Sequence, residues 1–324
     1  MRNGVKCASV FIGTVIGAGF ATGREVALFF KDCSPFTGLV AGLILGAFCA
    51  FFMYIGYEIK QPKLDNFLLR KKPKIVDAII FICAYITFIA MFSGAEAIVM
   101  QIFSIPLAGL MTAVIAISIA VLGLKQIKIL NMAVVPLIVA LILVIYFKYK
   151  HFSASGNLTF LNPIAYSSLN IMLAGCIMVR LGATSTKREI ASTGIMSGLI
   201  LGTMLFMIQS IVRSNTQLSM PMYSVAQQLG IGKLAGVLIF FAILTTLVSA
   251  AELLISDLEQ AVENRWLAGL VILACSWPIC ILFSFKQLVD TLYPIVSVFG
   301  VALVIVTTIR LAEKKCLSII NKKF

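Results

Sequence analysis

The sequence predicts an all-α membrane protein with about ten transmembrane helices. Three observations lead to this fold class: 60% of the 324 residues are hydrophobic, only 12% are charged, and long apolar runs recur along the whole chain. A water-soluble domain carries roughly 25% charged residues, whereas one helical span takes about 20 apolar residues. Ten spans with short loops would use nearly the whole length, which excludes a large soluble domain.

Apolar segments bounded by charged residues, proline or glycine define the expected helices. They cover residues 5–31, 36–59, 74–103, 105–124, 127–149, 162–182, 188–213, 232–262, 265–285 and 287–311. The first and the sixth are less regular than the others, because glycines interrupt both. The stretch 215–230 is too polar to span a membrane, and we expect it to lie across the outer surface.

The basic residues predict the orientation of the chain. Most of the 26 lysines and arginines, which give a net charge of +13, fall on one side if the N-terminus is cytoplasmic. The positive-inside rule then places both termini in the cytoplasm. The cluster at 60–74 weighs most, and it can also be explained as a binding site for anionic lipid. Because the charges lie in short clusters between spans, no nucleic-acid partner is expected.

Ten helices with both ends on one side can form two sets of five, the second inverted relative to the first. The pentapeptide GLILG stands at 42–46 and again at 198–202, in the second helix of each set. We therefore expect a first repeat at 1–149, an external connection at 150–161, a second repeat at 162–311 and a basic cytoplasmic tail at 312–324. Both glycine runs are also typical of faces where helices pack closely.

The first span carries the strongest sign of a binding site. Residues 11–30 read FIGTVIGAGFATGREVALFF, and each glycine costs a helix about 1 kcal/mol relative to alanine. If the chain unwinds around Gly17, Ala18 and Gly19, its free N–H groups could bind an anionic group and its carbonyls a small cation. A closely packed helix crossing without any ligand is the alternative. The candidate solute-binding residues are Gly17, Ala18, Gly19, Phe20, Tyr85, Asn170 and Gly175.

The eighth span carries a polar stripe that suggests an ion site. Thr245, Ser249 and Glu252 are spaced four and three residues apart, so they share one helix face. With the neighbouring Thr246, the hydroxyls could complete a Na⁺ shell begun by carbonyls of the first span. The alternative is hydrogen bonding to carbonyls of their own helix.

Two glutamates and two arginines are the remaining candidates. Glu96 and Glu252 lie within spans, where a carboxylate is costly unless it is paired, so each is either a proton carrier or cation ligand, or part of a structural pair. Arg24, Glu25 and Arg180 sit at the ends of the interrupted spans. They could gate the site or hold a solute carboxylate, although Arg180 could also simply reach to the membrane surface.

The sequence lacks the motifs that common hydrolytic and zinc-dependent enzymes need. The chain has one histidine and no HExxH or GxSxG pattern, and its cysteines fall largely within apolar runs without a CxxC pair. We expect neither an enzyme nor a cofactor, apart from a possible Na⁺.

The motif GTVIGAGFATGREVALFF at residues 13–30 resembles that of the YkvI-like bacterial membrane proteins, which look related to the LeuT-fold amino acid–polyamine–organocation transporters. The resemblance implies a five-plus-five inverted repeat, discontinuous first and sixth helices and alternating access. It also implies an ion position near Thr245, Thr246 or Ser249. Some proton-coupled relatives place a lysine of the fifth helix at the ion position. The fifth span here has no lysine beyond Lys128, which favours Na⁺ or no ion. The sixth span lacks a proline at its expected break.

These observations together predict a secondary active transporter. Its partners would be a small organic solute, with an amino acid or related carboxylate as the first choice, and the lipid bilayer. Transport would be coupled to Na⁺ or H⁺. The alternative is a membrane receptor of the same fold that senses a ligand without moving it.

Overall fold

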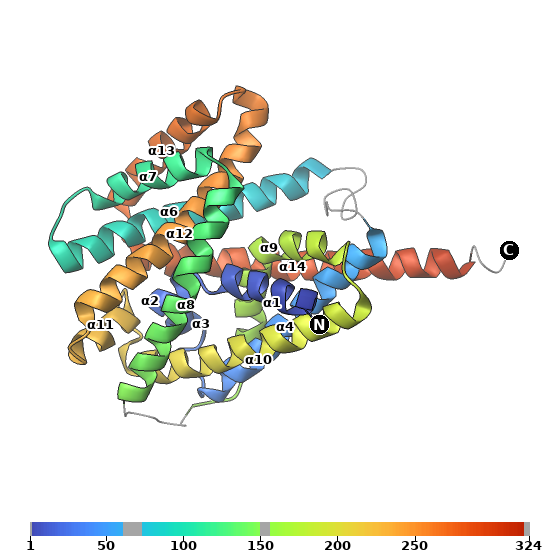
Figure 1. The fold of residues 1–324 in the computed structure, drawn as a ribbon, viewed down its shortest axis with the longest axis horizontal. Coiled ribbons are helices and arrows are strands. Elements are labelled where there is room, and N and C mark those ends of the chain that lie inside the picture. Colours follow the sequence, from blue (N-terminus) through green and yellow to red (C-terminus); the bar gives the residue numbers. More distant parts are fainter. Residues whose placement is uncertain (1, 61–72, 150–155, 321–324) are drawn as a thin grey trace.

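The computed structural model describes residues 2–60, 73–149 and 156–320, and it is almost entirely helical over these ranges (Figure 1). At positions 2, 73–75, 124–132, 173, 260 and 315–320 it describes the backbone but not the side chain. Most of the basic cluster expected at 60–74, the first half of the connection at 150–161 and the last four residues of the expected tail lie outside the described residues.

The helices follow the expected order. They are α1 (Arg2–Val15), α2 (Ala18–Thr22), α3 (Arg24–Phe29), α4 (Phe36–Ile59), α6 (Pro73–Phe103), α7 (Ala108–Val121), α8 (Leu124–Lys148), α9 (Leu161–Gly182), α10 (Lys187–Val212), η1 (Arg213–Asn215), α11 (Pro221–Gln228), α12 (Gly232–Val262), α13 (Arg265–Leu282) and α14 (Phe285–Ile320). Within the described ranges the extended backbone amounts to one isolated bridge, between Cys33 and Asn157.

The first expected span, 5–31, consists of three short helices instead of one. The chain leaves α1 after Val15 and enters α2 at Ala18, so only Ile16 and Gly17 lie between them. The expected unwound segment is therefore shorter than Gly17 to Gly19, because Ala18 and Gly19 already belong to α2. A second interruption follows at Gly23, whose φ of 72° is a left-handed conformation that glycine adopts without strain.

Three other segments differ from their expected bounds. Helix α7 begins at Ala108 instead of residue 105, after Ser104 and Leu107 have taken positive φ values. Helix α14 continues to Ile320, so most of the expected tail extends the last span. The polar stretch 215–230 contains α11, whose buried residues include Met222 and Tyr223. The hydrophobic face of this short helix explains why it packs onto the rest of the protein.

Six helices of the described chain are long and apolar enough to cross a membrane on their own. They are Phe36–Ile59, Val76–Phe103, Lys187–Asn215, Gly232–Glu259, Arg265–Leu282 and Phe285–Lys314. Helix α9 supplies a seventh if its two parts, Leu161–Met172 and Ala174–Gly182, count as one span with a 68° bend. The chain is therefore a multi-pass membrane protein. The ten-span count stays a prediction, because α1 to α3 are short pieces and α7 is a shorter apolar helix.

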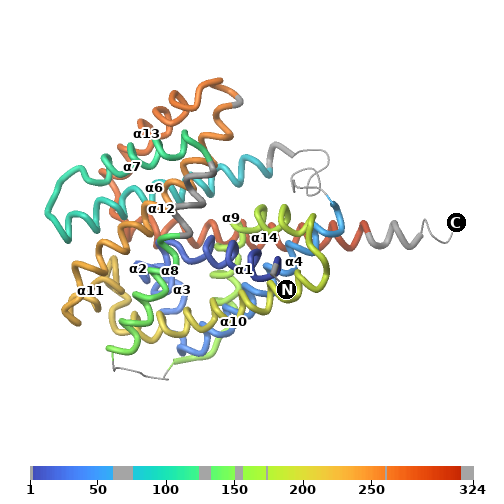
Figure 2. Tube along the Cα trace, in the orientation of Figure 1, coloured from blue at the N-terminus to red at the C-terminus, as the bar shows by residue number. Residues whose placement is uncertain are grey.

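The helices pack in two groups (Figures 1 and 2). Helices α4 and α1 each contact both α9 and α10, which makes one group, and α6, α7, α12 and α13 form the second group. Helix α14 packs against both α9 and α6, while α8 packs against α12 and α10. The short helix α2 contacts α12, so the interruption in the first span lies where the two groups meet.

Helices α4 and α10 meet along the two repeated glycine runs. A Cβ atom at Gly42 would lie 2.1 Å from the Cα of Gly202, and one at Gly46 would lie 2.4 Å from the carbonyl oxygen of Gly194. Contacts this short involve backbone atoms, which cannot turn away as a side chain can. The glycines are therefore what allows the two helix backbones to approach so closely.

Replacing Gly42 by alanine should destabilise the protein, because the new methyl group would meet the backbone of α10. Overpacking of this kind typically costs about 1–3 kcal/mol. We expect a clear fall in the melting temperature of the purified protein in detergent. Gly13→Ala is the control, since a Cβ there would meet only Val135 Cγ2, at 3.8 Å. Equal melting temperatures for the two variants would contradict the packing argument.

Candidate functional site

The interruption at Gly17 lies directly against Thr246 of α12. The backbone N–H of Ala18 donates to the hydroxyl of Thr246, with 3.2 Å between the two heavy atoms. A Cβ at Gly17 would lie only 2.7 Å from that same hydroxyl oxygen. Glycine is thus required at position 17 for the close approach to α12. One N–H group freed by the break is satisfied by a side chain of the other helix group, as a low-polarity environment demands.

The hydroxyls of the expected ion site bond to their own helix. Thr245 and Thr246 both donate to the carbonyl oxygen of Ala242, at 2.8 and 3.1 Å, and Ser249 donates to the carbonyl oxygen of Thr245 at 2.9 Å. This is the arrangement considered above as the alternative to an ion site. It also gathers three oxygen atoms, from Ala242, Thr245 and Thr246, beside the interruption at Gly17.

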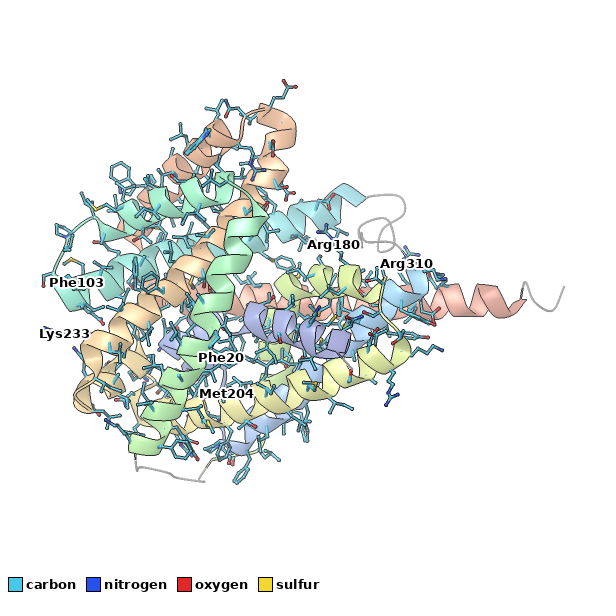
Figure 3. All side chains as sticks on the ribbon, viewed as in Figure 1. Phe20, Phe103, Arg180, Met204, Lys233 and Arg310 are labelled. Carbon is cyan, nitrogen blue, oxygen red and sulfur yellow. The ribbon has the colours of Figure 1, made fainter. Side chains whose placement is uncertain are left out.

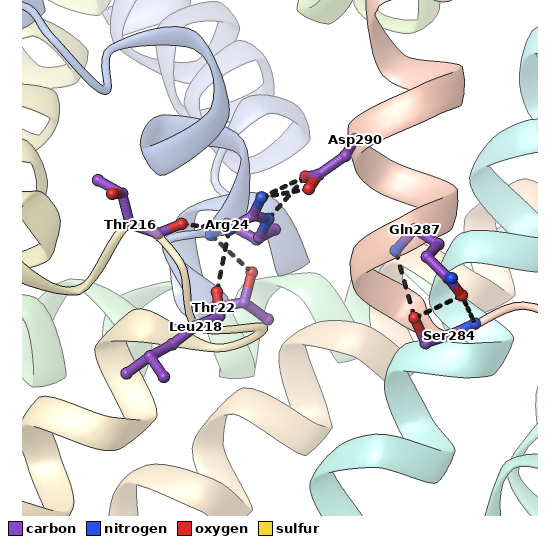
Figure 4. A network of polar contacts seen from close by, with 7 residues as sticks. All are labelled: Thr22, Arg24, Thr216, Leu218, Ser284, Gln287 and Asp290. Atoms are coloured by element: carbon purple, nitrogen blue, oxygen red, sulfur yellow. Dashed lines mark hydrogen bonds and ion pairs between the residues drawn. The ribbon is translucent and has the colours of Figure 1, made fainter.

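Arg24 is buried and forms an ion pair with Asp290 of α14 (Figure 4). Its Nε atom donates to Asp290 Oδ1 at 2.8 Å, and its Nη1 atom donates to the carbonyl oxygens of Thr216, at 2.5 Å, and Leu218, at 3.0 Å. The side chain of Arg24 is 5% exposed and that of Asp290 is 31% exposed. Arg24 therefore connects α3 to α14 and to the loop before α11.

Asp290 is a residue that the sequence analysis did not select. The signal was available, because Asp290 is a carboxylate inside the apolar run of the last span, and such residues are rarely without a role. The pairing of Arg24 with Asp290 needed the structure, since 266 residues separate them.

Glu25 points in the opposite direction from Arg24, toward the interruption. A Cβ at Gly19 would lie 1.9 Å from the Cδ atom of Glu25, so the carboxyl group rests against the backbone of α2. The absence of a side chain at Gly19 creates the space that this carboxylate fills. Sequence analysis grouped Glu25 with Arg24, but the two neighbours face different surroundings.

Aromatic side chains surround this part of α2. Phe20 is fully buried, and its ring centre lies 6.5 Å from that of Tyr166 on α9. Tyr166 is also fully buried, and it contacts the rings of Phe29 and Phe30 on its other sides. The interruption is therefore bordered by a cluster of aromatic rings that α9 and the first span supply together. Tyr166, like Asp290, was not selected from the sequence.

Three expected solute-binding residues bond or pack within the helices instead. Asn170 donates to the carbonyl oxygen of Tyr166 in its own helix, at 3.0 Å. Gly175 allows close packing, since a Cβ there would lie 3.1 Å from the ring of Phe52 on α4. Tyr85 lies beside Ser276 of α13, within the second helix group. Their role in solute binding stays a prediction.

The two membrane glutamates hold helix ends together. Glu96 accepts hydrogen bonds from the backbone N–H groups of Leu107, at 3.1 Å, and Gly109, at 2.6 Å, at the start of α7. Glu252 lies 3.9 Å from Arg265, which also pairs with Glu259 at 2.8 Å. Both arrangements fit the structural alternative stated for these residues.

Arg265 also bonds to the end of α7. Its Nη2 and Nε atoms donate to the carbonyl oxygens of Ala120, at 3.0 Å, and Val121, at 3.2 Å. Val121 is the last residue of α7, where carbonyl groups lack partners within the helix and a cation is favourable; the Ala120 carbonyl also accepts from the backbone N–H of Gly123, at 3.0 Å. Arg265 therefore joins α7, α12 and α13.

Arg180 lies near the far end of α9 and is exposed (Figure 3). Its position fits the expectation of a side chain that reaches the membrane surface. Among the described residues, no group of three or more histidines, cysteines or carboxylates could hold a metal ion.

Comparison with solved structures defines the class of fold. The chain is similar to the inward-facing conformation of Mhp1, with a TM-score of 0.69 and 10% sequence identity over 94% of this chain and 74% of that one. It is also similar to MhsT in complex with L-phenylalanine, with a TM-score of 0.67 and 14% identity over 93% and 87% of the two chains. The protein thus has the fold of the LeuT-type transporters.

The chain is also similar in sequence to two proteins of Bacillus subtilis (strain 168). The chain is 25% identical to the uncharacterized protein YyaD over 94% of this chain and 96% of that one. It is 30% identical to the uncharacterized membrane protein YkvI over 63% and 64% of the two chains. These homologues confirm the resemblance to YkvI-like membrane proteins drawn from the motif at 13–30. No protein-family model matches the chain.

Proposed function

We propose that the protein is a secondary active transporter of a small organic solute. The observation that carries the proposal is the interruption of the first span at Gly17, in contact with Thr246 of α12. Irregular backbone at membrane depth is tolerated where it is buried in protein or lines a cavity, and secondary transporters use such segments as solute sites. The transporter fold of the chain supports this reading of the interruption.

An inverted repeat would explain a second irregularity. The two GLILG segments are offset by 156 residues, and the same offset carries Gly17 to Leu173. The parts of α9 on either side of this residue, Leu161–Met172 and Ala174–Gly182, are inclined to each other by 68°. The interruption and the bend therefore fall at equivalent positions, which supports two inverted sets of five helices with irregular first members. Alternating access would then be a rocking of one helix group against the other around these two positions.

The coupling ion would be Na⁺ or H⁺. The hydroxyl oxygens of Thr245 and Thr246 each lie within hydrogen-bond distance of the Ala242 carbonyl oxygen, beside a glycine whose neighbours can offer carbonyl oxygens. Oxygen ligands suit a hard cation such as Na⁺. The hydroxyls can keep donating to Ala242 or turn to an ion, so this cluster is where we place Na⁺. Ser249, one turn further along α12, is a less direct candidate.

The solute would be an amino acid or a related carboxylate, bound between α2, α9 and α12. The first N–H groups of α2 lie at the interruption, and the rings of Phe20 and Tyr166 supply an apolar border. The protein would reside in the bacterial cytoplasmic membrane with both termini in the cytoplasm, as the distribution of basic residues favours. Arg24 and Asp290 would close one side of the site.

A thermal-shift screen of the purified protein tests the solute and the ion together. We expect amino acids to raise the melting temperature, with a larger shift in Na⁺ than in choline, because a ligand that binds only the folded state stabilises it by mass action. Thr246→Val should remove the Na⁺ dependence. A shift that is identical in both salts would exclude Na⁺ as the coupling ion.

Flux into proteoliposomes separates a transporter from a receptor. A solute that stabilises the protein should accumulate in the vesicles when a Na⁺ or proton gradient is imposed, and an ionophore should abolish the accumulation. Binding without flux under either gradient would favour the ligand-sensing receptor of the same fold.

A further inference from the structure

Glu25 is a charged group without a partner in the part of the chain that the structure describes. No hydrogen bond or ion pair of its carboxylate is found there, although its Cδ, Oε1 and Oε2 atoms all lie within about 2 Å of where a Gly19 Cβ would stand. A carboxylate at this depth in a membrane protein is unfavourable unless it is paired, protonated or exposed to water. Its position at the interruption makes a bound ligand the natural partner.

The nearest cation on the chain cannot serve. Arg24, the adjacent residue, is committed to Asp290 and to the carbonyl oxygens of Thr216 and Leu218, on the other side of α3. These bonds use its Nε, Nη1 and Nη2 atoms. A rotation of Arg24 toward Glu25 would leave Asp290 without this partner and would free two carbonyl oxygens. Among the described residues no cation pairs with Glu25, so a bound ligand can supply the matching positive charge.

The surroundings of Glu25 suit an organic cation. The phenol groups of Tyr166 and Tyr293, which are 0% and 3% exposed, lie close enough to this carboxylate to be affected by its charge. The hydroxyl of Tyr166 is itself buried without a hydrogen-bond partner among the described residues, since the nearby Asn170 amide donates to the Tyr166 carbonyl instead. A buried, unpartnered hydroxyl beside an unpaired carboxylate indicates a missing polar group, and aromatic faces attract ammonium groups.

We infer that Glu25 binds a protonated amine of the solute, with Phe20, Tyr166 and Tyr293 around the ammonium group. The inference rests on the proposed transport function and refines it. The solute is then a zwitterionic amino acid or an amine, and a simple carboxylic acid without an amino group is excluded. Na⁺ is a poorer match for this position, because it needs several oxygen ligands and Glu25 offers one carboxylate among aromatic rings.

Matched probes distinguish these charges. We use three sets of probes, and the three members of each set share a side chain and differ in their charged groups. The sets are alanine, ethylamine and propionate; leucine, 3-methylbutylamine and 4-methylpentanoate; and phenylalanine, 2-phenylethylamine and 3-phenylpropionate. Binding of each is measured as the thermal shift of the purified full-length protein. We expect stabilisation by at least one zwitterion or amine and none by the carboxylates. A carboxylate that stabilises as strongly as its amino counterpart, or a lack of any shift with all ammonium probes, would overturn the inference.

Variants at the site then test Glu25 itself. Glu25→Gln should raise the Kd of the binding amine at least about tenfold, since it removes a charge-assisted hydrogen bond. Gly19→Ala should also weaken it, because the added methyl group displaces the carboxylate. Glu25→Asp keeps the charge and should retain partial binding even if Glu25→Gln folds poorly. Glu313→Gln, on the exposed face of α14, is the matched control and should bind as the unmodified protein does.

The remaining outcomes separate the inference from the proposed function. Amine binding that needs Glu25 but produces no flux would leave the inference intact and refute transport. Flux of a carboxylate that is unchanged in Glu25→Gln would support transport and refute the inference. A shift produced by Na⁺ alone and lost in Glu25→Gln would assign Glu25 to the ion and overturn the inference.

Discussion

Gly17→Val is expected to abolish uptake while the protein remains in the membrane. The Cβ atom would lie 2.7 Å from Thr246 Oγ1, so this hydroxyl would have to move and the N–H of Ala18 would lose its acceptor. A buried donor left without a partner costs about 1–3 kcal/mol, and the overpacking adds a similar amount. Because the change falls on the proposed site, uptake should drop by at least about tenfold.

The matched control for this prediction is Gly13→Val, in the preceding helix α1. A Cβ at Gly13 would meet only Val135 Cγ2, at 3.8 Å, so the same substitution should leave uptake largely intact. Membrane content is compared by quantitative immunoblotting, and uptake by radiolabelled solute in proteoliposomes. Gly19→Val should also abolish uptake, through displacement of Glu25. Normal transport by both Gly17→Val and Gly19→Val would remove the basis of the proposed site.

The second large effect is expected at the pair of Arg24 and Asp290. Asp290→Leu should lower the melting temperature markedly, because removing one partner of a buried pair leaves the other charge uncompensated, at a cost of about 3 kcal/mol. The double variant Arg24→Met/Asp290→Leu should regain most of this stability, since an apolar pair of similar volume is often as stable as the ion pair. Uptake should stay lost in the double variant if the pair closes the site.

This comparison separates a structural pair from a functional one. Stability is measured by thermal denaturation in detergent and uptake in proteoliposomes, for both single variants and the double. The exposed pair of Arg310 and Glu313 provides the control, since such pairs contribute about 0–1 kcal/mol and Glu313→Leu should change neither quantity much. A double variant that is stable and transports normally would show that the pair only holds α3 against α14.

The sequence alone predicted the fold class and the irregular first span on which the proposed site depends, because both follow from local patterns. Apolar run length indicated a helical membrane protein, and the glycines of 13–23 indicated an irregular first span. Thr246 could be selected because polar residues on one face of a long apolar helix are uncommon. The GLILG repeat similarly pointed to α4 and α10, which the structure places in direct backbone contact.

The partners across the structure could not be predicted, because they depend on distances between helices that are remote in sequence. Arg24 was selected without Asp290, and Glu25 was placed with Arg24 although it faces Gly19. Glu96 shows the same limit: its carboxylate satisfies the start of α7, which depends on a tight turn at Leu107 that has no strong sequence signal. A charged residue in a membrane span indicates that a partner exists, but only the structure identifies that partner.

Charged side chains from neighbouring helices bind both ends of helix α7. Its first N–H groups are bound by Glu96 of α6, and its last carbonyls by Arg265 of α13, which also reaches two glutamates on α12. A fourteen-residue helix anchored in this way cannot slide or tilt on its own without breaking several charge-assisted bonds. We therefore expect the α6, α7, α12 and α13 group to stay rigid and, in the proposed transport cycle, the α1, α4, α9 and α10 group that faces it to make the larger displacement.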